Sequence, residues 1–273
     1  PLVVEIDDNM LATPTYNPAS AVYGQGSPFR KTAIDQFRMA DALIVSTPYL
    51  AEVYSEYNKN IYVIPNSLDF RVWDNVRHKK NKDLIRIGWA GGASHSEDLR
   101  IIESVVHKTL AKHPTTVFCF VHGIPDFLRG IPRVEAVYEF SRIDRYPQFL
   151  ASRGFDIGLA PLVDSSFNRA KSNLRWLEYS GLKIPTIASN VGHFAETVTH
   201  EVNGLLCNNE YDWLQSIDFL ISDENARKKI GKNANQTARK NFNVDLNVFR
   251  YKEALADIVA RGQVVKLPQE AVA

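Results

Sequence analysis

Residues 84–121 read LIRIGWAGGASHSEDLRIIESVVHKTLAKHPTTVFCFV, with an apolar run at each end and a glycine-rich turn after the first run. The runs 85–89 and 116–121 are short and rich in β-branched and aromatic residues, which predicts buried strands. Apolar residues of the middle stretch recur at helical spacing: Leu99, Ile102, Val106 and Leu110. We therefore predict a helix over 97–112 and a parallel strand–helix–strand unit.

The same alternation of short apolar runs and helical stretches continues along the chain. Further strands are expected at 2–6, 42–46, 61–64, 134–138, 156–160, 184–188 and 204–207. Further helices are expected at 30–40, 48–57, 145–152, 171–181, 210–221, 223–240 and 245–261. This order of elements predicts an α/β fold with doubly wound, Rossmann-like parallel sheets.

The segment 67–83 is polar and lacks clear periodicity, so it is expected to link two domains. Residues 84–240 have the length of one complete domain. Residues 1–66 resemble the trailing part of a second domain, and the helix at 245–261 is expected to pack back on them. Because the chain begins directly with a strand, we expect either a missing upstream segment or a naturally short protein.

The composition indicates a soluble globular protein without a strong charge bias. The 32 Lys and Arg residues nearly balance the 31 Asp and Glu residues, so nothing in the net charge calls for nucleic acid. No apolar run reaches the length of a membrane-spanning helix, although peripheral membrane association stays open. Cys119 and Cys207 lie in separate apolar runs, which predicts buried reduced thiols and a cytoplasmic location.

Ligands of open α/β sheets bind beyond the carboxyl ends of the strands, so the loops there are the candidate sites. The loop after 85–89 contains Gly91, Gly92, Ser94 and His95, whose backbone amides suit a phosphate group. The glycine spacing matches neither the P-loop nor the dinucleotide fingerprint, and a plain tight turn is the alternative. His95 either donates to an anion or caps the following helix.

The expected helix 171–181 places Lys171, Arg175 and Glu178 on one face. Such a stripe is usually a solvated surface. Here, however, the cations lie at the helix N-terminus, where the helix dipole disfavours positive charge, so a bound anion would relieve the conflict. Other candidate ligands of that anion lie at the helix start: Arg169 through its charge, and Ser172 and Asn173 through their amides. The loop EFSRIDRYP, residues 139–147, could present backbone groups to a planar base.

A family resemblance strengthens these assignments. Residues 170–206, AKSNLRWLEYSGLKIPTIASNVGHFAETVTHEVNGLL, resemble the nucleotide-sugar site of GT-B glycosyltransferases of family 4. The resemblance extends over 84–262. The stretches VEIDDNM (4–10) and FRMADALIVSTPYLAEVY (37–54) resemble the end of that family's N-terminal domain, which would then be truncated in this chain.

The resemblance implies roles for individual residues. Glu178 matches the glutamate that accepts hydrogen bonds from the ribose hydroxyls, and Asn173 and Leu174 match backbone positions near the diphosphate. Arg142 and Ile143 match the stretch that contacts the base.

Two family features are missing from their usual places. The glutamate that addresses the donor sugar falls at Ala170, and the two phosphate-binding cations fall at Trp89 and Ser94. We expect Lys171 and Arg175, with Arg169 and His95, to supply the missing positive charge.

The resemblance implies a retaining hexosyltransferase that moves a sugar from a nucleoside diphosphate donor to a glycan, lipid or protein acceptor, with no metal or other cofactor. The expected catalytic residues are Lys171, Arg175, His95 and Asp7. Asp7 belongs to an acidic cluster with Glu5 and Asp8, which could contact the acceptor; a metal-binding D-x-D motif is the rival interpretation. A non-catalytic nucleotide-sugar binding module and a sugar-nucleotide epimerase are the alternative functions.

Overall fold

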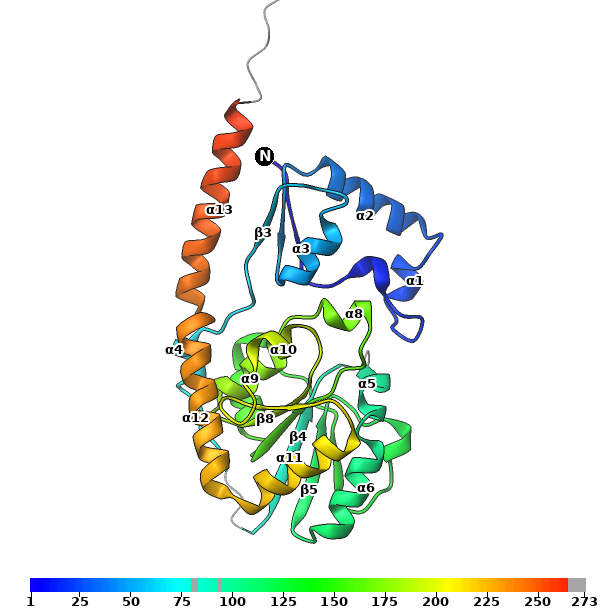
Figure 1. The fold of residues 1–273 in the computed structure, drawn as a ribbon, viewed down its shortest axis with the longest axis vertical. Coiled ribbons are helices and arrows are strands. Elements are labelled where there is room, and N and C mark those ends of the chain that lie inside the picture. Colours follow the sequence, from blue (N-terminus) through cyan, green and yellow to red (C-terminus); the bar gives the residue numbers. More distant parts are fainter. Residues whose placement is uncertain (80–82, 93–94, 265–273) are drawn as a thin grey trace, which may run out of the picture.

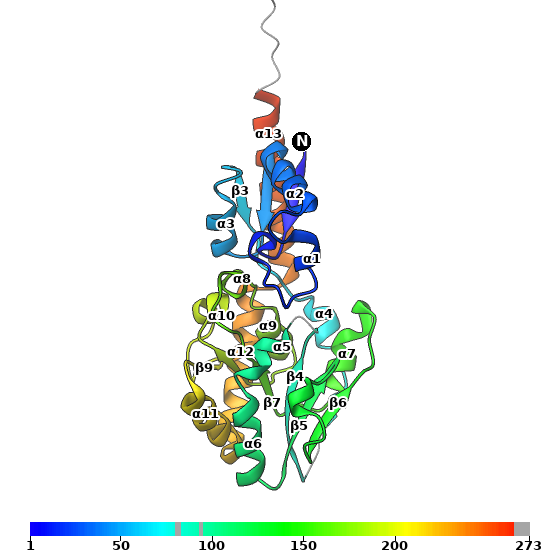
Figure 2. The ribbon, with the colours of Figure 1, turned by 90° about the vertical axis from the view of Figure 1, so that its right-hand side faces the viewer.

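The computed structural model describes residues 1–79, 83–92 and 95–264, with side chains as far as Arg261. Its elements form two parallel sheets (Figures 1 and 2). The smaller sheet has the order β1-β2-β3, and the larger has the order β6-β5-β4-β7-β8-β9. The strands are β1 (Val3–Ile6), β2 (Ala42–Val45), β3 (Ile61–Val63), β4 (Ile85–Ala90), β5 (Thr116–Val121), β6 (Val134–Val137), β7 (Ile157–Ala160), β8 (Thr186–Ser189) and β9 (Leu205–Cys207). All neighbouring strands pair in parallel, which confirms the predicted α/β class.

Helices cover both faces of the smaller sheet. On one face, α2 (Pro28–Met39) and α3 (Pro48–Tyr54) bury Phe37, Leu50 and Tyr54 against the strands. Each of these helices begins with a proline that follows a capping hydroxyl residue, a strong start signal. On the other face lies α13 (Val244–Val264), whose Ala254 packs against Ile44 and Ile64. The short η1 (Met10–Ala12) and α1 (Ser20–Tyr23) follow β1.

The larger sheet lies between two layers of helices. The layer on one face consists of α5 (Ser96–Arg100), α6 (Glu103–Lys112) and α11 (Glu210–Ser222). The opposite layer consists of α4 (Phe70–Trp73), α7 (Tyr146–Ala151), α9 (Leu174–Gly181) and α12 (Glu224–Asn241). The remaining short helices are η3 (Asp126–Leu128), η4 (Ile143–Arg145), α8 (Ser166–Arg169) and α10 (Gly192–Thr197).

Two strand glycines allow aromatic rings to lie directly on the sheet. A Cβ atom added to Gly88 would lie 2.2 Å from the Phe155 ring, and one added to Gly158 would lie 2.4 Å from the Tyr179 ring. The hydroxyl of Tyr179 accepts a hydrogen bond from the backbone amide of Ala90 at 3.1 Å. Helix α9 is thereby fixed against the carboxyl end of β4, where the candidate site begins.

The helix expected at 48–57 ends at Tyr54, and two further predicted helices differ from the structure near the candidate site. The helix expected at 97–112 is two helices, because the amides of Ile101 and Ile102 bond to carbonyls three residues back and tighten the chain between α5 and α6. The helix expected at 171–181 begins only at Leu174. Lys171 therefore precedes the helix, and the predicted three-residue charged stripe is reduced to Arg175 and Glu178.

The segment expected to be an irregular linker contains a helix. Asp69 caps α4 through the amide of Arg71, and Phe70 and Trp73 are buried in the core of the larger sheet. The prediction missed this turn of helix because a four-residue element is too short to show periodicity.

Two crossings connect the sheets, and they lie side by side. Leu68, on the way to the larger sheet, pairs with Asn243 on the way back. The Leu68 amide donates to the Phe242 carbonyl at 2.9 Å, and the Val244 amide donates to the Leu68 carbonyl at 3.0 Å. Helix α13 then runs along the smaller sheet, where Tyr251 donates its hydroxyl proton to Glu5 (Figure 1).

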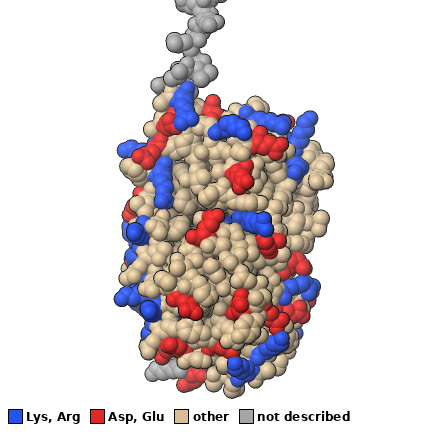
Figure 3. Space-filling model, in the orientation of Figure 1, with Lys and Arg blue, Asp and Glu red and all other residues tan. Residues whose placement is uncertain are grey.

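On the face shown in Figure 3, acidic and basic side chains are interspersed over both sheets. Cys119 and Cys207 are buried free thiols, as predicted. Within the described residues, every helix is too short or too polar to cross a bilayer.

Candidate active site

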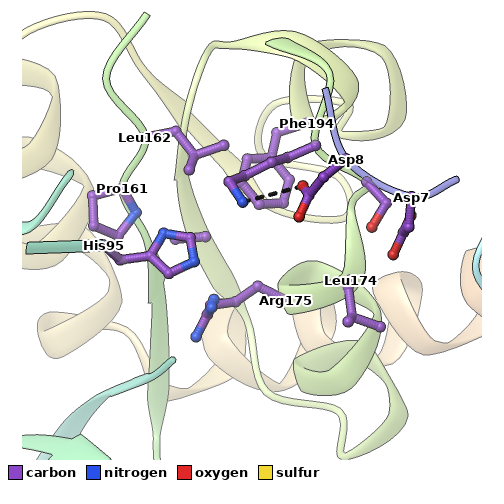
Figure 4. A pocket seen from close by; sticks show the side chains of 11 residues that line it. Asp7, Asp8, His95, Pro161, Leu162, Leu174, Arg175 and Phe194 are labelled. Carbon is purple, nitrogen blue, oxygen red and sulfur yellow. Dashed lines mark hydrogen bonds and ion pairs between the residues drawn. The ribbon is translucent and has the colours of Figure 1, made fainter. Parts of the chain in front are cut away.

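Loops from both sheets enclose a first pocket of about 190 Å³ (Figure 4). We call it the charged pocket. The smaller sheet contributes Asp7 and Asp8, which directly follow β1. The larger sheet contributes the remaining lining residues: His95, Ala160, Pro161, Leu162, Lys171, Ser172, Leu174, Arg175 and Phe194. The pocket thus brings together six of the predicted site residues, namely Asp7, His95, Lys171, Ser172, Leu174 and Arg175.

Lys171 crosses the charged pocket toward the smaller sheet. Its Nζ atom lies 3.4 Å from Asp8 Oδ1 and 4.5 Å from the centre of the Phe167 ring. The side chain is 17% exposed, so the ammonium group is largely enclosed. Lys171 therefore already has a carboxylate partner, and an incoming anion would compete with Asp8.

Arg175 occupies the opposite wall and has no carboxylate partner among the described residues. Its guanidinium carbon lies 5.1 Å from the centre of the Trp89 ring, and its buried Nη1 atom makes no hydrogen bond to any residue that the structure describes. Gly91 makes this position available, because an added Cβ atom would lie 2.7 Å from both Nη atoms. The sequence predicts a phosphate-binding backbone at this glycine; the structure shows the guanidinium group of Arg175 beside it.

His95 is held by a buried carboxylate. Its Nδ1 atom lies 2.8 Å from Asp98 Oδ2, and the Asp98 side chain is only 1% exposed. Burial lowers the pKa of His95, the hydrogen bond to Asp98 opposes this, and the charges of Arg175 and Lys171 lower the pKa further. The His95 side chain provides no capping bond to α5. Figure 4 shows the ring directed toward Arg175.

A second pocket of about 340 Å³ adjoins the first and shares Leu174 and Arg175 with it. We call it the aromatic pocket, because the rings of His122 and Tyr146 line it. Its other lining residues are Ala90, Gly91, Gly92, Ser141, Ile143 and Glu178. Phe140 extends the aromatic surface, since its ring stacks on His122 with 4.8 Å between centroids. All of these residues belong to the larger sheet and its loops.

Glu178 lies in the wall of the aromatic pocket. Tyr146 donates its hydroxyl proton to Glu178 Oε2 at 3.3 Å. Burial raises the pKa of Glu178 to about 7, although the positive charge of Arg175 and the Tyr146 hydrogen bond act in the opposite direction. The carboxyl group therefore changes protonation near neutral pH.

Three predicted site residues lie away from both pockets. Arg142 is 79% exposed and pairs with Asp144 at 3.1 Å, whereas Arg169 pairs with Asp164 at 2.5 Å. These short pairs keep both guanidinium groups on the surface. The Asn173 side chain is buried and donates to Thr197 Oγ1 at 3.1 Å. Ser94 lies outside the described residues.

Four residues of the site were not predicted. Trp89 and Tyr146 had been interpreted as strand and helix residues, and both rings in fact support charged side chains of the pockets. Asn66 donates from Nδ2 to Ser172 Oγ at 2.8 Å and to Asp7 at 3.2 Å, which connects the two sheets beside the charged pocket. Asp98, in the first turn of α5, binds His95. The spacing of His95 and Asp98, one helical turn apart, is the one signal that could have revealed their contact.

A further cavity of about 420 Å³ opens on the other side of Asp7, Asp8 and Lys171. Its walls belong mainly to the smaller sheet and combine carboxylates with aromatic rings. The remaining lining residues are Glu5, Ile6, Met10, Thr13, Asn17, Ala19, Tyr23 and Phe167. We call it the acidic cavity.

Comparison with known proteins identifies the fold. Residues 174–237, which run from α9 into α12, match the family model described as glycosyl transferases group 1. No protein among the curated sequences matches the chain.

Several solved structures are similar to the chain. Sucrose-phosphate synthase from Thermosynechococcus elongatus has a TM-score of 0.65 at 18% identity, over 88% of this chain and 65% of that one. Anabaena HepE in complex with UDP and glucose has a TM-score of 0.68 at 18% identity, over 94% of this chain and 71% of that one. A glycosyltransferase from Rickettsia africae has a TM-score of 0.61 at 18% identity, over 84% of this chain and 67% of that one.

The chain therefore spans about two thirds of the length of these proteins. At such identities the likeness establishes the fold. The chain has the GT-B fold of glycosyltransferases, and its segment 174–237 matches the family model of glycosyl transferases group 1.

Proposed function

We propose that the chain is the greater part of a retaining glycosyltransferase that transfers a sugar from a nucleoside diphosphate donor. The diphosphate binds in the charged pocket, and the nucleoside binds in the aromatic pocket. The observation that carries this proposal is Arg175, which lies at the junction of the two pockets and has no carboxylate within ion-pair distance in the part of the chain that the structure describes.

The half-buried guanidinium group of Arg175 supports a diphosphate site on energetic grounds. A buried polar atom without a hydrogen bond, such as its Nη1 atom among the described residues, is costly, and a planar guanidinium group is suited to binding two phosphate oxygens. Lys171 faces it from the opposite wall, so a diphosphate between them would meet two positive charges. These charges would stabilise the diphosphate as it leaves the sugar, when its negative charge increases.

The aromatic pocket has the features that a nucleoside needs. Glu178 offers a carboxylate to the ribose hydroxyls, and Tyr146 holds that carboxylate in place. The base would lie against the ring of His122 and the exposed side chain of Ile143. Stacking on such a surface tolerates different bases, so the geometry leaves the choice of base open.

The acidic cavity supports an acceptor site. It shares Asp7, Asp8 and Lys171 with the charged pocket, so an acceptor bound there would lie beside the transferred sugar. Carboxylates and the rings of Tyr23 and Phe167 suit the hydroxyl groups and apolar faces of a sugar. The acceptor is then a glycan or the glycosylated part of a lipid or protein.

The alternative is a non-catalytic nucleotide-sugar binding module. One observation favours it: Ala170, which stands where the family resemblance expects a donor-sugar glutamate, is fully buried among residues of the smaller sheet. Its carbonyl accepts a hydrogen bond from Thr47 Oγ1 at 3.1 Å. Position 170 is thus buried, and it provides no carboxylate for a donor sugar.

A two-stage experiment distinguishes these functions. A panel of nucleoside diphosphate sugars, UDP-glucose included, is screened by thermal shift, and the binders are then tested for nucleotide release with a mixture of oligosaccharide acceptors. We expect a shift for at least one donor and acceptor-dependent release. Binding without release supports the non-catalytic alternative, and the absence of any shift contradicts both functions.

A further inference from the structure

Asp98 is the most deeply buried carboxylate near the charged pocket, and no donor-binding role is assigned to it. Its Oδ1 atom accepts two hydrogen bonds, from the Val163 amide at 2.8 Å and from Asn168 Nδ2 at 2.7 Å. Its Oδ2 atom accepts from His95 Nδ1 at 2.8 Å. A buried carboxylate is costly unless it is hydrogen-bonded, and here three donors surround it.

This arrangement fixes the tautomer of His95. Since a carboxylate oxygen only accepts, the ring carries its proton on Nδ1, and a neutral His95 has a lone pair on Nε2. Because His95 lines the charged pocket and its Nδ1 atom is occupied, Nε2 is the atom left for a ligand. Figure 4 shows the ring directed into the pocket.

We propose that Asp98 is a positioning residue that makes His95 Nε2 a proton-uptake site for the diphosphate. In the free protein Nε2 carries no proton. When a diphosphate binds, Nε2 takes a proton from solvent and donates it in a hydrogen bond to a phosphate oxygen, and the Asp98 carboxylate balances the imidazolium charge. This inference rests on the proposed donor site.

The charges around His95 explain why uptake depends on the ligand. Arg175 from α9 and Lys171 from the preceding loop face the ring and disfavour its protonation, whereas Asp98 on the ring's own helix favours it. Asp7 and Asp8 line the same pocket from the smaller sheet. A bound diphosphate would neutralise the two cations and so raise the pKa of His95.

Other titrating groups in the region can be separated from this effect. Tyr16 lies near Asp98 and Glu97, but burial, and then these charges, raise its pKa above its already high normal value. Glu178 also titrates near neutral pH, but its contribution to proton uptake is the same in the wild type and in variants at position 98, so it cancels in the comparison. The ligand in the measurement is a nucleoside diphosphate sugar, because a nucleoside diphosphate has a terminal phosphate group that itself titrates near neutral pH.

The substitution Asp98→Asn tests the tautomer directly. Val163 and Asn168 both donate to Oδ1, so the amide oxygen of the variant takes that side and its NH₂ group must face His95. His95 Nδ1 then becomes an acceptor, and the neutral ring carries its proton on Nε2. The hydrogen bonds from Val163 and Asn168 persist in the variant. Because Nε2 already carries a proton, no proton uptake is needed to bind the diphosphate, and the negative charge that would balance an imidazolium is absent.

The measurement is the titration of UDP-glucose into the protein by calorimetry in two buffers of different ionisation enthalpy. Because Glu178 contributes equally to both proteins, the quantity compared is the difference between wild type and Asp98→Asn. Near pH 7.5 the wild type should take up clearly more protons than Asp98→Asn. The ratio of wild-type to variant affinity should rise as the pH falls from 8.5 to 6, by up to about tenfold for each pKa unit by which the ligand raises the pKa of His95.

Two further variants complete the test. His95→Gln should abolish the uptake in the same way and serves if Asp98→Asn does not fold. Glu97→Gln removes an exposed carboxylate of the same helical turn and should retain the wild-type uptake. Equal uptake in wild type, Asp98→Asn and His95→Gln, with binding intact, overturns the inference but leaves the donor site standing. If the wild type binds no nucleoside diphosphate sugar at all, both fail.

Discussion

The charged pocket and the aromatic pocket share Arg175 and Leu174 but are built differently. The aromatic pocket belongs to the larger sheet alone, and two side chains of one helix, Arg175 and Glu178, define its chemistry. The charged pocket needs both sheets, and its lysine is already paired with Asp8 across the boundary. The aromatic pocket is a preformed binding surface, whereas the shape of the charged pocket depends on how the two sheets are placed relative to each other.

The largest expected effect concerns the support of the aromatic pocket. Trp73 is 7% exposed and its indole packs on Gly181 and against the ring of Tyr146. Trp73→Ala should lower the free energy of unfolding by about 3–5 kcal/mol, because it removes a large buried side chain. Urea unfolding measures the change. Phe29→Ala, at an aromatic residue that is 62% exposed, is the control, and a similar loss there would contradict the argument.

The next largest effect concerns the residue that the pockets share. Arg175→Met should weaken UDP binding about tenfold to a hundredfold, because charge-assisted hydrogen bonds contribute about 1.5–3 kcal/mol. Uridine, which lacks the diphosphate, should bind almost as before. Competition titrations of the two ligands measure both values. An equal loss of affinity for uridine and UDP would place Arg175 in the nucleoside site. An unchanged affinity for UDP would show that the diphosphate does not bind in this pocket.

A smaller effect should be confined to the aromatic pocket and depend on pH. Glu178→Gln should weaken uridine binding about tenfold at pH 8, where the carboxyl group is ionised. The wild-type pKa is about 7, so wild-type affinity should increase as the pH rises from 6 to 8, while the variant should show a flat profile. Isothermal titration at several pH values tests this. A wild-type profile as flat as that of Glu178→Gln would mean that the carboxylate does not contact the ribose.

The smallest effect should distinguish the charged pocket. Asp8→Asn releases Lys171 from its ion pair, so UDP should bind more tightly, by up to about fivefold, since exposed or partly exposed pairs are worth at most about 1 kcal/mol. Uridine binding should not change. Fluorescence competition is sensitive enough for this comparison. Weaker UDP binding would show instead that Asp8 positions the lysine for its ligand.

The contrast between the pockets also explains what the sequence could predict. The strands, most helices and the position of Arg175 followed from periodicity and from the rule that ligands bind beyond the strands. The sequence pattern predicts Lys171 within a helix, but α9 begins three residues later, at Leu174, so Lys171 lies in the preceding loop.

The pairing of surface arginines was beyond prediction for a different reason. Asp164 and Asp144 bind Arg169 and Arg142 at the ends of single-turn helices, which are too short for periodicity to show which side chains meet. Asp98 illustrates the same limit: two of its three donors come from residues 65 and 70 positions away. Such contacts depend on the tertiary fold, not on local spacing.

The paired crossings at Leu68 and Asn243 have a mechanical consequence. A single flexible connection would allow one sheet to twist freely against the other. Two chain segments joined by backbone hydrogen bonds at one point permit bending there but resist twisting. Bending at this point would change the distance between Asp8 on one side of the charged pocket and Arg175 on the other.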